Sequence, residues 1–231
     1  MSLAMPLAPP APAQSPPAKD GRRKTYAVKE CFLTLQGEGV QAGARAVFLR
    51  FAGCNLWSGR EADRASAICR FCDTDFVGTD GVNGGKLRGA EALGQLVERV
   101  WDGPAAHRLV VITGGEPMLQ LDPAVLDALH ARGFRVAVES NGTIAAVPGI
   151  DWLCISPKAG SAVVQRAGDE LKLVWPQAGI DPATLESWDF AHFLVQPMDG
   201  PDGAVEAAIA LAMARPKWRL SLQAHKVVGL A

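Results

Sequence analysis

The sequence predicts an α/β fold: an incomplete barrel of the TIM type, with about six core parallel strands and about three main helices. Short apolar runs rich in β-branched residues recur along the chain, as is typical of buried strands. Helical segments alternate with several of these runs, which indicates parallel strands joined by crossovers. Some connections, such as Asn141–Asp151, are too short for a full helix, so we expect fewer helices than strands.

Each predicted strand is a short apolar run. In chain order they are Tyr26–Phe32, Ala46–Gly53, Arg108–Gly115, Phe134–Ser140, Trp152–Pro157, Leu171–Trp175, His192–Pro197 and Trp218–Gln223. Ligands bind at the carboxyl ends of the strands in such sheets. We therefore look for functional residues just after these runs.

Three segments have the spacing or the end signals of helices. Ala90–Trp101 places its leucines and valines on one face. Asp122–Ala131 begins with an aspartate suited to an N-cap and a proline at the first helical position, and Gly133 provides a stop signal. Gly203–Ala214 is the third, and Pro216 ends it.

Length and composition indicate one globular domain, residues 25–231, after a leader. Six of the first twenty residues are prolines, so we expect residues 1–24 to be a disordered leader or a segment added for expression. The net charge of -1 and pI near 6.4 give no support for nucleic-acid binding. No apolar run approaches the roughly 18 residues that a membrane span requires.

The five cysteines indicate metal or redox chemistry rather than a disulfide framework. The number is odd and no secretory signal is evident, so a reducing cytoplasm is the expected location. Cys31 and Cys154 lie in apolar runs, and we expect both to be buried thiols without a ligand role.

The other three cysteines, Cys54, Cys69 and Cys72, are spaced unevenly, with fourteen residues in the first gap and two in the second. Cys54 follows a predicted strand, and the later pair can face one site. Three thiolates favour zinc or an iron–sulfur cluster. No fourth ligand lies at zinc-finger spacing, whereas a cubane cluster with three protein ligands leaves one iron open. Structural zinc and free buried thiols remain the alternatives.

A second motif, Val110–Pro117, runs from a buried strand into two glycines, an acid and a proline. Gly114 and Gly115 would let a ligand approach the backbone closely. Glu116 could accept a hydrogen bond from an ammonium group. The alternative is an ordinary strand end with a glycine turn.

Three cysteines followed by Gly-Gly-Glu-Pro resemble the radical S-adenosylmethionine superfamily, and further motifs resemble its 7-carboxy-7-deazaguanine synthase (QueE) family. The motifs are Thr34–Gly39, Phe48–Cys54, Cys72–Phe76, Val111–Pro117, Glu139–Thr143, Ile155–Lys158, Leu194–Pro197 and Leu220–Lys226. The resemblance covers about residues 26–231. It departs from the superfamily's Cys-x3-Cys-x2-Cys pattern in the first gap, which is eleven residues longer.

The resemblance implies that Cys54, Cys69 and Cys72 hold a [4Fe-4S] cluster. The open iron would bind S-adenosylmethionine, whose cleavage generates a 5′-deoxyadenosyl radical; such chemistry belongs to the cofactor. The implied S-adenosylmethionine contacts are Phe71, Gly114, Gly115, Glu116, Ser140, Asn141, Ser156, Lys158 and Gln196.

The substrate implied by the resemblance is 6-carboxy-5,6,7,8-tetrahydropterin. Arg50 suits its carboxylate through bidentate pairing, although a buried structural ion pair is the alternative. Glu38 matches the donor edge of the pterin. The implied substrate contacts are Leu35, Gln36, Gly37, Glu38, Arg50, Thr113, His225 and the terminal carboxylate of Ala231.

The family also implies that Thr74 binds Mg²⁺. One hydroxyl binds Mg²⁺ weakly, so substrate and water must complete the coordination. In the implied reaction the radical removes the hydrogen from substrate C6, the ring contracts, hydrogen returns to regenerate S-adenosylmethionine, and ammonia is lost. A flavodoxin as reductant and a homodimer are the implied partners.

Two other functions remain as alternatives. One is a glycyl-radical-enzyme activase, which would share the cluster but act on a protein; the Thr34–Gly39 and Leu220–Lys226 motifs speak against it. The other is a non-enzymatic protein stabilised by zinc. Iron and sulfide analysis separates the last from both enzymes.

Overall fold

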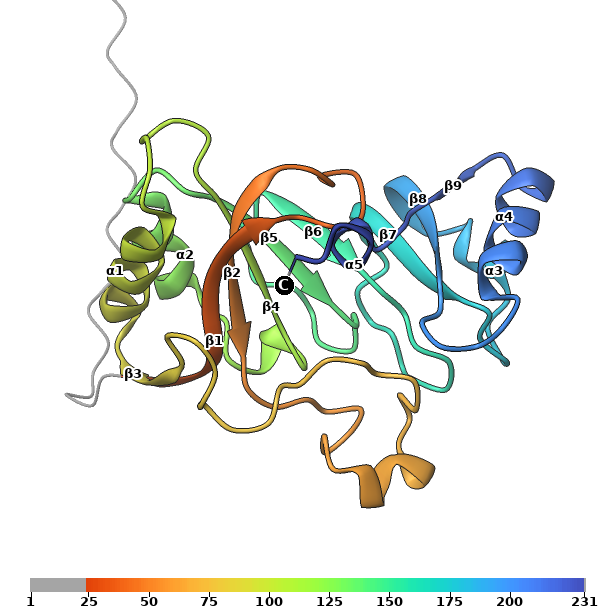
Figure 1. Ribbon diagram of the computed structural model, residues 1–231, viewed down its shortest axis with the longest axis horizontal. Coiled ribbons are helices and arrows are strands. Elements are labelled where there is room, and N and C mark those ends of the chain that lie inside the picture. The colour runs from red at the N-terminus through yellow and green to blue at the C-terminus, as the bar shows by residue number, and fades with distance from the viewer. Residues whose placement is uncertain (1–23, 231) are drawn as a thin grey trace, which may run out of the picture.

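A computed structural model describes residues 24–230 and shows a mixed α/β fold with a nine-stranded sheet and few helices (Figure 1). The strands are ordered β3-β1-β2-β4-β5-β6-β7-β8-β9, so the sheet is open, with β3 and β9 at its two edges. The predicted leader lies outside the described residues except for Lys24.

Seven of the strands, β2 and β4 to β9, are mutually parallel. Their bounds are β2 Arg45–Phe51, β4 Leu109–Gly114, β5 Arg135–Ser140, β6 Trp152–Ile155, β7 Ala167–Trp175, β8 Asp189–Pro197 and β9 Trp218–Leu220. All the predicted strands are present. The parallel set slightly exceeds the expected six because β9, of three residues, joins it at the edge.

The first strands differ from the predicted parallel pattern. The strand β1 (Thr25–Leu35) pairs antiparallel to β2, because the segment between them is shorter than a parallel crossover requires. The strand β3 (Gly85–Arg88) pairs antiparallel to β1 and was not predicted. It has four residues with alternating burial, which leaves little apolar signal in the sequence.

The three predicted helices are present as α1 (Ala90–Trp101), α2 (Pro123–His130) and α4 (Ala204–Ala214). The Asp122 side chain caps α2 by accepting a hydrogen bond from the Val125 N–H at 3.2 Å, as predicted. Short elements complete the structure: η1 Glu61–Ser66, η2 Pro117–Leu119, α3 Pro182–Leu185 and α5 Ala224–Val228. None of the described helices is long and apolar enough to span a membrane.

The two faces of the sheet have different roles. One face carries Leu49, Ile112, Val138 and Leu173 into the main apolar core, which includes Leu93, Val97, Val125 and Ala208 of the covering helices. The other face has only a small apolar cluster near the strand starts, formed around Ala46, Val111 and Ala137. Beyond this cluster the second face turns polar, and the candidate site lies there.

Candidate active site

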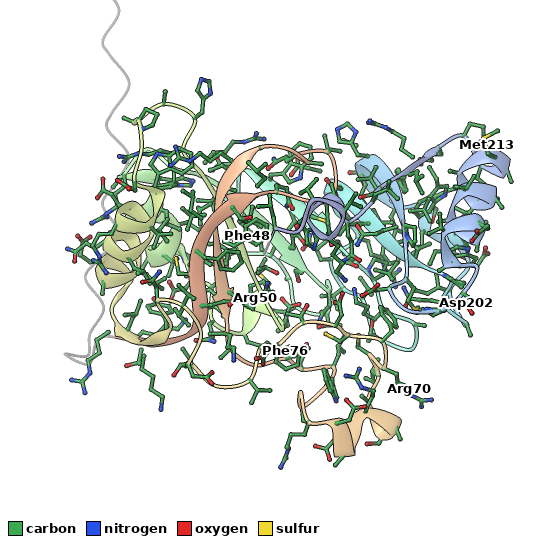
Figure 2. All side chains as sticks on the ribbon, viewed as in Figure 1. Phe48, Arg50, Arg70, Phe76, Asp202 and Met213 are labelled. Carbon is green, nitrogen blue, oxygen red and sulfur yellow. The ribbon has the colours of Figure 1, made fainter. Side chains whose placement is uncertain are left out.

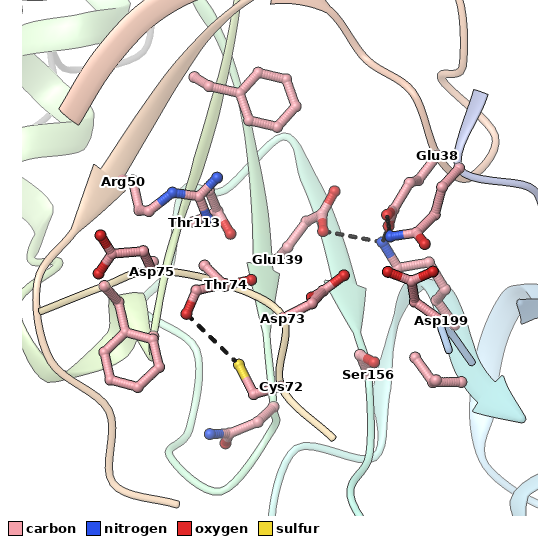
Figure 3. Close-up of a pocket in the computed structure, with 18 of the residues that line it drawn as sticks. Glu38, Arg50, Cys72, Asp73, Thr74, Asp75, Thr113, Glu139, Ser156 and Asp199 are labelled. Carbon is pink, nitrogen blue, oxygen red and sulfur yellow. Dashed lines mark hydrogen bonds and ion pairs between the residues drawn. The ribbon is translucent and has the colours of Figure 1, made fainter. Parts of the chain in front are cut away.

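A cavity of about 410 Å³ lies over the polar face of the sheet, toward the carboxyl ends of the parallel strands. Strands β1, β2, β4, β5, β7 and β8 each contribute lining residues, as do the cysteine loop and α5. Figure 3 shows Arg50 and Thr113 on one side of this space, Glu38 on the other, and Cys72 with Thr74 at its edge.

Backbone hydrogen bonds join the two ends of the long segment between Cys54 and Cys69. The Leu56 carbonyl accepts hydrogen bonds from the N–H groups of Ile68 and Cys69, at 3.1 and 3.3 Å. Residues 57–68 therefore form an excursion that starts and ends beside Leu56, and Trp57 at its start still lines the cavity. Cys69 consequently lies near Cys54 in space, despite the fourteen residues between them.

All three predicted cluster ligands line the cavity, and their thiols are partly or largely buried. The Cys69 thiol is hydrogen-bonded to Cys72, and this bond lowers the pKa of Cys72 to about 6 although burial opposes it. The same bond, together with burial, raises the pKa of Cys69. Burial raises the pKa of Cys54. Such a thiol set suits a metal or cluster, which binds thiolates.

Within residues 24–230, no three His, Cys, Asp or Glu side chains lie close enough to hold one metal ion. Cys31 and Cys154 are both buried, as predicted, and neither lines the cavity.

The glycine pair after β4 lets two strand ends meet closely. A Cβ atom on Gly115 would lie 2.3 Å from the Gly53 carbonyl oxygen and 2.6 Å from Cys54 Cβ. The Glu116 N–H also donates to the Gly53 carbonyl at 2.9 Å. Gly114 and Gly115 both line the cavity beside Cys54. Any side chain at Gly115 would displace the cysteine loop.

Glu116 lies behind the cavity wall and is fully buried. Its carboxylate accepts hydrogen bonds from the Ser140 hydroxyl and the Asn141 and Met118 N–H groups, each at 2.8 or 2.9 Å. Burial raises the pKa of Glu116, although these bonds oppose the effect. In this structure Glu116 fixes the end of β5, and the predicted contact with S-adenosylmethionine would require it to move.

The remaining residues predicted to bind S-adenosylmethionine surround the cysteine loop. Lys158 donates to Ser156, 2.6 Å from its hydroxyl, and lies over the Phe71 ring with its Nζ 5.9 Å from the centroid. Burial lowers the pKa of Lys158. Phe71, Ser140, Asn141, Ser156, Lys158 and Gln196 all line the cavity.

The opposite side of the cavity contains a buried charge cluster formed by Glu38, Glu139 and Lys172. The Lys172 ammonium makes ion pairs with both carboxylates, at 3.0 Å from Glu139 and in short contact with Glu38. Burial would raise the pKa of Glu38, but the charge and hydrogen bond of Lys172 hold it at about 2. Glu38 is thus a permanent anion at neutral pH. It can accept hydrogen bonds from the N–H groups of a heterocycle.

Amide side chains complete this cluster. Gln36 donates to Glu139 at 2.9 Å, and Gln223 donates to Glu38 at 2.9 Å. These bonds fix both carboxylates, so the cluster presents oriented acceptors to the cavity.

Arg50 lies beside Thr113, because β2 and β4 pair at these two residues, and both line the cavity (Figure 3). The Arg50 Nε atom makes an ion pair with Glu30 at 2.8 Å. The structural ion pair weighed as an alternative is therefore present, and a substrate contact would use the rest of the guanidinium. Figure 2 shows Arg50 and Phe48 on β2.

The C-terminal segment returns to the loop after β1. The Ala224 N–H donates to the Gly37 carbonyl at 2.8 Å. The His225 ring packs so closely on Gly37 that a Cβ there would lie 2.0 Å from His225 Nδ1. Leu35, Gln36, Gly37 and His225 all line the cavity. Ala231, predicted to contact the substrate, lies outside the described residues.

Thr74 lines the cavity between two aspartates that are held by lysines. Asp73 pairs with Lys226 of α5 at 2.7 Å, and Asp75 pairs with Lys29 of β1 at 2.7 Å. These pairs anchor the Thr74 backbone from both sides of the cavity mouth. Both carboxylates are engaged, so Thr74 would depend on other oxygen donors to bind Mg²⁺.

The structure thus places every described residue of the predicted site on the cavity except Glu116. It also adds residues that the sequence interpretation missed, chiefly Glu139, Lys172 and Gln223. The sequence did contain a signal for Lys172, because it is the one charged residue inside the apolar run Leu171–Trp175. Glu139 gave one too, since it directly precedes the predicted Ser140. Gln223 gave none, because its role depends on where the chain returns.

Comparison with known proteins identifies relatives along nearly the whole domain. No family model matches the chain. The chain is 62% identical to 7-carboxy-7-deazaguanine synthase of Caulobacter vibrioides over 208 residues, 89% of this chain and 99% of the relative. It is 51% identical to the protein of that name from Nitratidesulfovibrio vulgaris over 214 residues, with the same shares covered.

A solved structure is also similar. QueE from Escherichia coli superposes with a TM-score of 0.67 at 27% sequence identity, covering 87% of this chain and 95% of that one. Sequence identities of 51–62% over nearly the whole length of both chains indicate common family membership as well as a common fold. The chain belongs to the 7-carboxy-7-deazaguanine synthase family.

Proposed function

We propose that this chain is a radical S-adenosylmethionine enzyme that converts 6-carboxy-5,6,7,8-tetrahydropterin to 7-carboxy-7-deazaguanine with loss of ammonia, in the biosynthesis of queuosine and other 7-deazapurines. One observation carries the proposal beyond the family relationship. A single cavity is lined by three thiols, by an oriented pair of carboxylates, and by Arg50, which lies across the space from Glu38. A cofactor and a polar heterocycle can therefore meet in it.

The cysteine side fits a [4Fe-4S] cluster, with Cys54, Cys69 and Cys72 as its ligands. Bound there, the cluster and S-adenosylmethionine supply the radical that removes a hydrogen atom from the substrate. The backbone beside Gly114 and Gly115 and the end of β5 would orient the methionyl group. Phe71, Ser156, Lys158 and Gln196 would surround the rest of the cofactor. We assign Glu116 to holding Ser140 and Asn141 in place, because its carboxylate is occupied by them.

The opposite side fits the pterin. Glu38, kept anionic by Lys172, would accept hydrogen bonds from the donor edge of the ring. Arg50 and Thr113 would bind the substrate carboxylate across the cavity, and Glu30 would fix the guanidinium. Leu35, Gln36, Gly37 and His225 would cover the ring. These contacts hold the substrate with one carbon toward the cofactor.

Thr74 is proposed as the protein ligand of Mg²⁺. Its position between Asp73 and Asp75 at the cavity edge would bring the ion to the substrate. The ion would then act as a template and Lewis acid only when substrate completes its coordination. Metal binding should therefore depend on substrate.

Several coarser features belong to the same proposal. Residues 25–231 would act as one domain, with the open sheet as a partial barrel of the TIM type. A homodimer and a flavodoxin as electron donor would complete the system.

The proposal is tested with anaerobically reconstituted protein. Iron and sulfide analysis and the broad visible absorption of a [4Fe-4S] cluster come first. The protein is then given reductant, S-adenosylmethionine, Mg²⁺ and the pterin, and we expect 7-carboxy-7-deazaguanine by mass spectrometry. An intact cluster without this product would overturn the assignment and favour a different substrate, such as the protein substrate of an activase.

A further inference from the structure

One side chain of the excursion, residues 57–68, reaches back to the backbone around Cys69 and Cys72. Residues 57–68 include η1 and project away from the sheet as a loop (Figure 1). The two ends of this loop meet at Leu56. Most of the charged side chains of η1 face solvent. Arg64 is an exception, because its side chain is 29% exposed and turns back toward the cysteines.

The guanidinium of Arg64 contacts four residues. Its Nη1 donates to the backbone carbonyls of Arg70 and Cys72, at 2.9 and 3.1 Å. Its Nε lies 2.8 Å from both carboxylate oxygens of Glu61. The guanidinium carbon lies 4.0 Å from the centroid of the Trp57 ring, a cation–π distance.

The contacts with Trp57 and with the two backbone carbonyls fix the guanidinium with respect to the loop base. Trp57 is 8% exposed, donates from its indole to the Arg60 carbonyl at 3.2 Å, and packs edge-on against Phe76. The Trp57 ring is therefore held in place, and the Arg64 guanidinium stacks on it. The two carbonyls that Arg64 binds flank Phe71 and belong to the Cys69–Cys72 turn.

The later part of the loop has its own anchors, since Lys226 holds Asp73 and Lys29 holds Asp75. For the Cys69–Cys72 turn, Arg64 is the cationic side chain that binds the backbone, as far as the described residues show. We propose that Arg64 is a positioning residue for the cluster cysteines, and that the excursion serves to supply it. Arg64 orders the turn so that the thiols of Cys69 and Cys72 face the cavity before a cluster binds.

The chemistry favours arginine at this position. A guanidinium has five donors in a fixed plane and can stack on an aromatic ring while it donates to two sides. A lysine has one donor centre and cannot bind Glu61 and two carbonyls in the same geometry. Loss of such supporting contacts around a metal site typically costs 10- to 100-fold in affinity or activity.

The test compares Arg64→Gln, Arg64→Lys and the control Arg60→Gln in the full chain. Arg60 lies in the same excursion, but its side chain is 78% exposed and pairs with Asp63 of the excursion, at 3.3 Å. The main readout is the rate at which the visible absorption of the reconstituted cluster is lost to an iron chelator. The second is the electron paramagnetic resonance signal of the reduced cluster with and without S-adenosylmethionine.

We expect the cluster of Arg64→Gln to be lost roughly 10- to 100-fold faster than that of the wild type. We also expect a broadened resonance signal, with the far-ultraviolet circular dichroism unchanged. Arg64→Lys should restore little of the stability, and Arg60→Gln should match the wild type. If Arg64→Gln does not fold, Arg64→Lys, which keeps the charge, carries the test.

A wild-type rate and signal in either Arg64 variant would overturn the inference. So would an equal defect in Arg60→Gln, because the effect would then come from the charge of the excursion. The inference rests on the proposed function only in requiring that the three thiols hold a cluster. A wild type without a cluster would refute that function, whereas a normal wild type with unaffected Arg64 variants would refute the role of Arg64 alone.

Discussion

Lys172→Met is the substitution that best tests the charge cluster beneath the proposed pterin site. Lys172 is 4% exposed and is the cation shared by Glu38 and Glu139. On folding, the pKa of Glu38 falls from the ordinary 4.5 to about 2, although burial opposes this. A shift of this size corresponds to about 3 kcal/mol. Removing one partner of a buried pair typically costs about 3–5 kcal/mol, because the other charge is left unpaired.

We therefore expect the free energy of unfolding to fall by about 3–5 kcal/mol at pH 7.5 in Lys172→Met. Urea unfolding of the cluster-free protein measures it, with the exposed Lys86→Met as the control. The pH dependence has a definite sign. In the wild type Glu38 stabilises the fold above about pH 4.5, and this contribution is lost as the pH falls toward 2.

In the variant the sign reverses, because burial without Lys172 raises the pKa of Glu38. A carboxyl group with a raised pKa contributes stability at low pH and loses it as the pH rises. The deficit of Lys172→Met should therefore be smaller at pH 5 than at pH 7.5, and adding Glu38→Gln should recover part of it. A deficit below about 1 kcal/mol, or one that does not change with pH, would refute the reasoning.

Three further substitutions test other parts of the site. Cys72→Ala should abolish cluster assembly by iron analysis whereas Cys31→Ala should retain it, and an equal loss in both would contradict the ligand assignment. Arg50→Lys should raise the KM for the pterin at least roughly tenfold, since lysine lacks the bidentate fork; unchanged kinetics would remove Arg50 from the site. Thr74→Ala should weaken the stimulation of turnover by added Mg²⁺, and a Mg²⁺ titration identical to the wild type would exclude Thr74 as a ligand.

The strands and main helices could be predicted because their signals are local. The apolar runs and the cap at Asp122 need no tertiary information, and both recur in the structure. The antiparallel start of the sheet was missed, although the segment between Leu35 and Arg45 is shorter than a parallel crossover requires and was a signal for it. The strand β3 was missed because it has four residues, none of them fully buried, so its apolar signal is weak.

The candidate site divides along similar lines. Residues after strand ends, such as Cys54 and Gly114, were predictable from topology, since parallel strands bring their carboxyl ends together. Glu116 shows the limit, because sequence gives its place at a strand end but not that its carboxylate turns inward to Ser140. The role of Arg64 could not be predicted either. It depends on the hydrogen bonds of Ile68 and Cys69 to the Leu56 carbonyl, which bring the two ends of the excursion together.

In the proposed function, one cavity brings the pterin to the cofactor held by the three cysteines. Substrate deuterated at C6 tests it most directly, with S-adenosylmethionine recovered after turnover and analysed by mass spectrometry. We expect deuterium in the adenosyl 5′ position, since hydrogen would be taken from C6 and later returned. Product formed with no deuterium in S-adenosylmethionine or 5′-deoxyadenosine would contradict it.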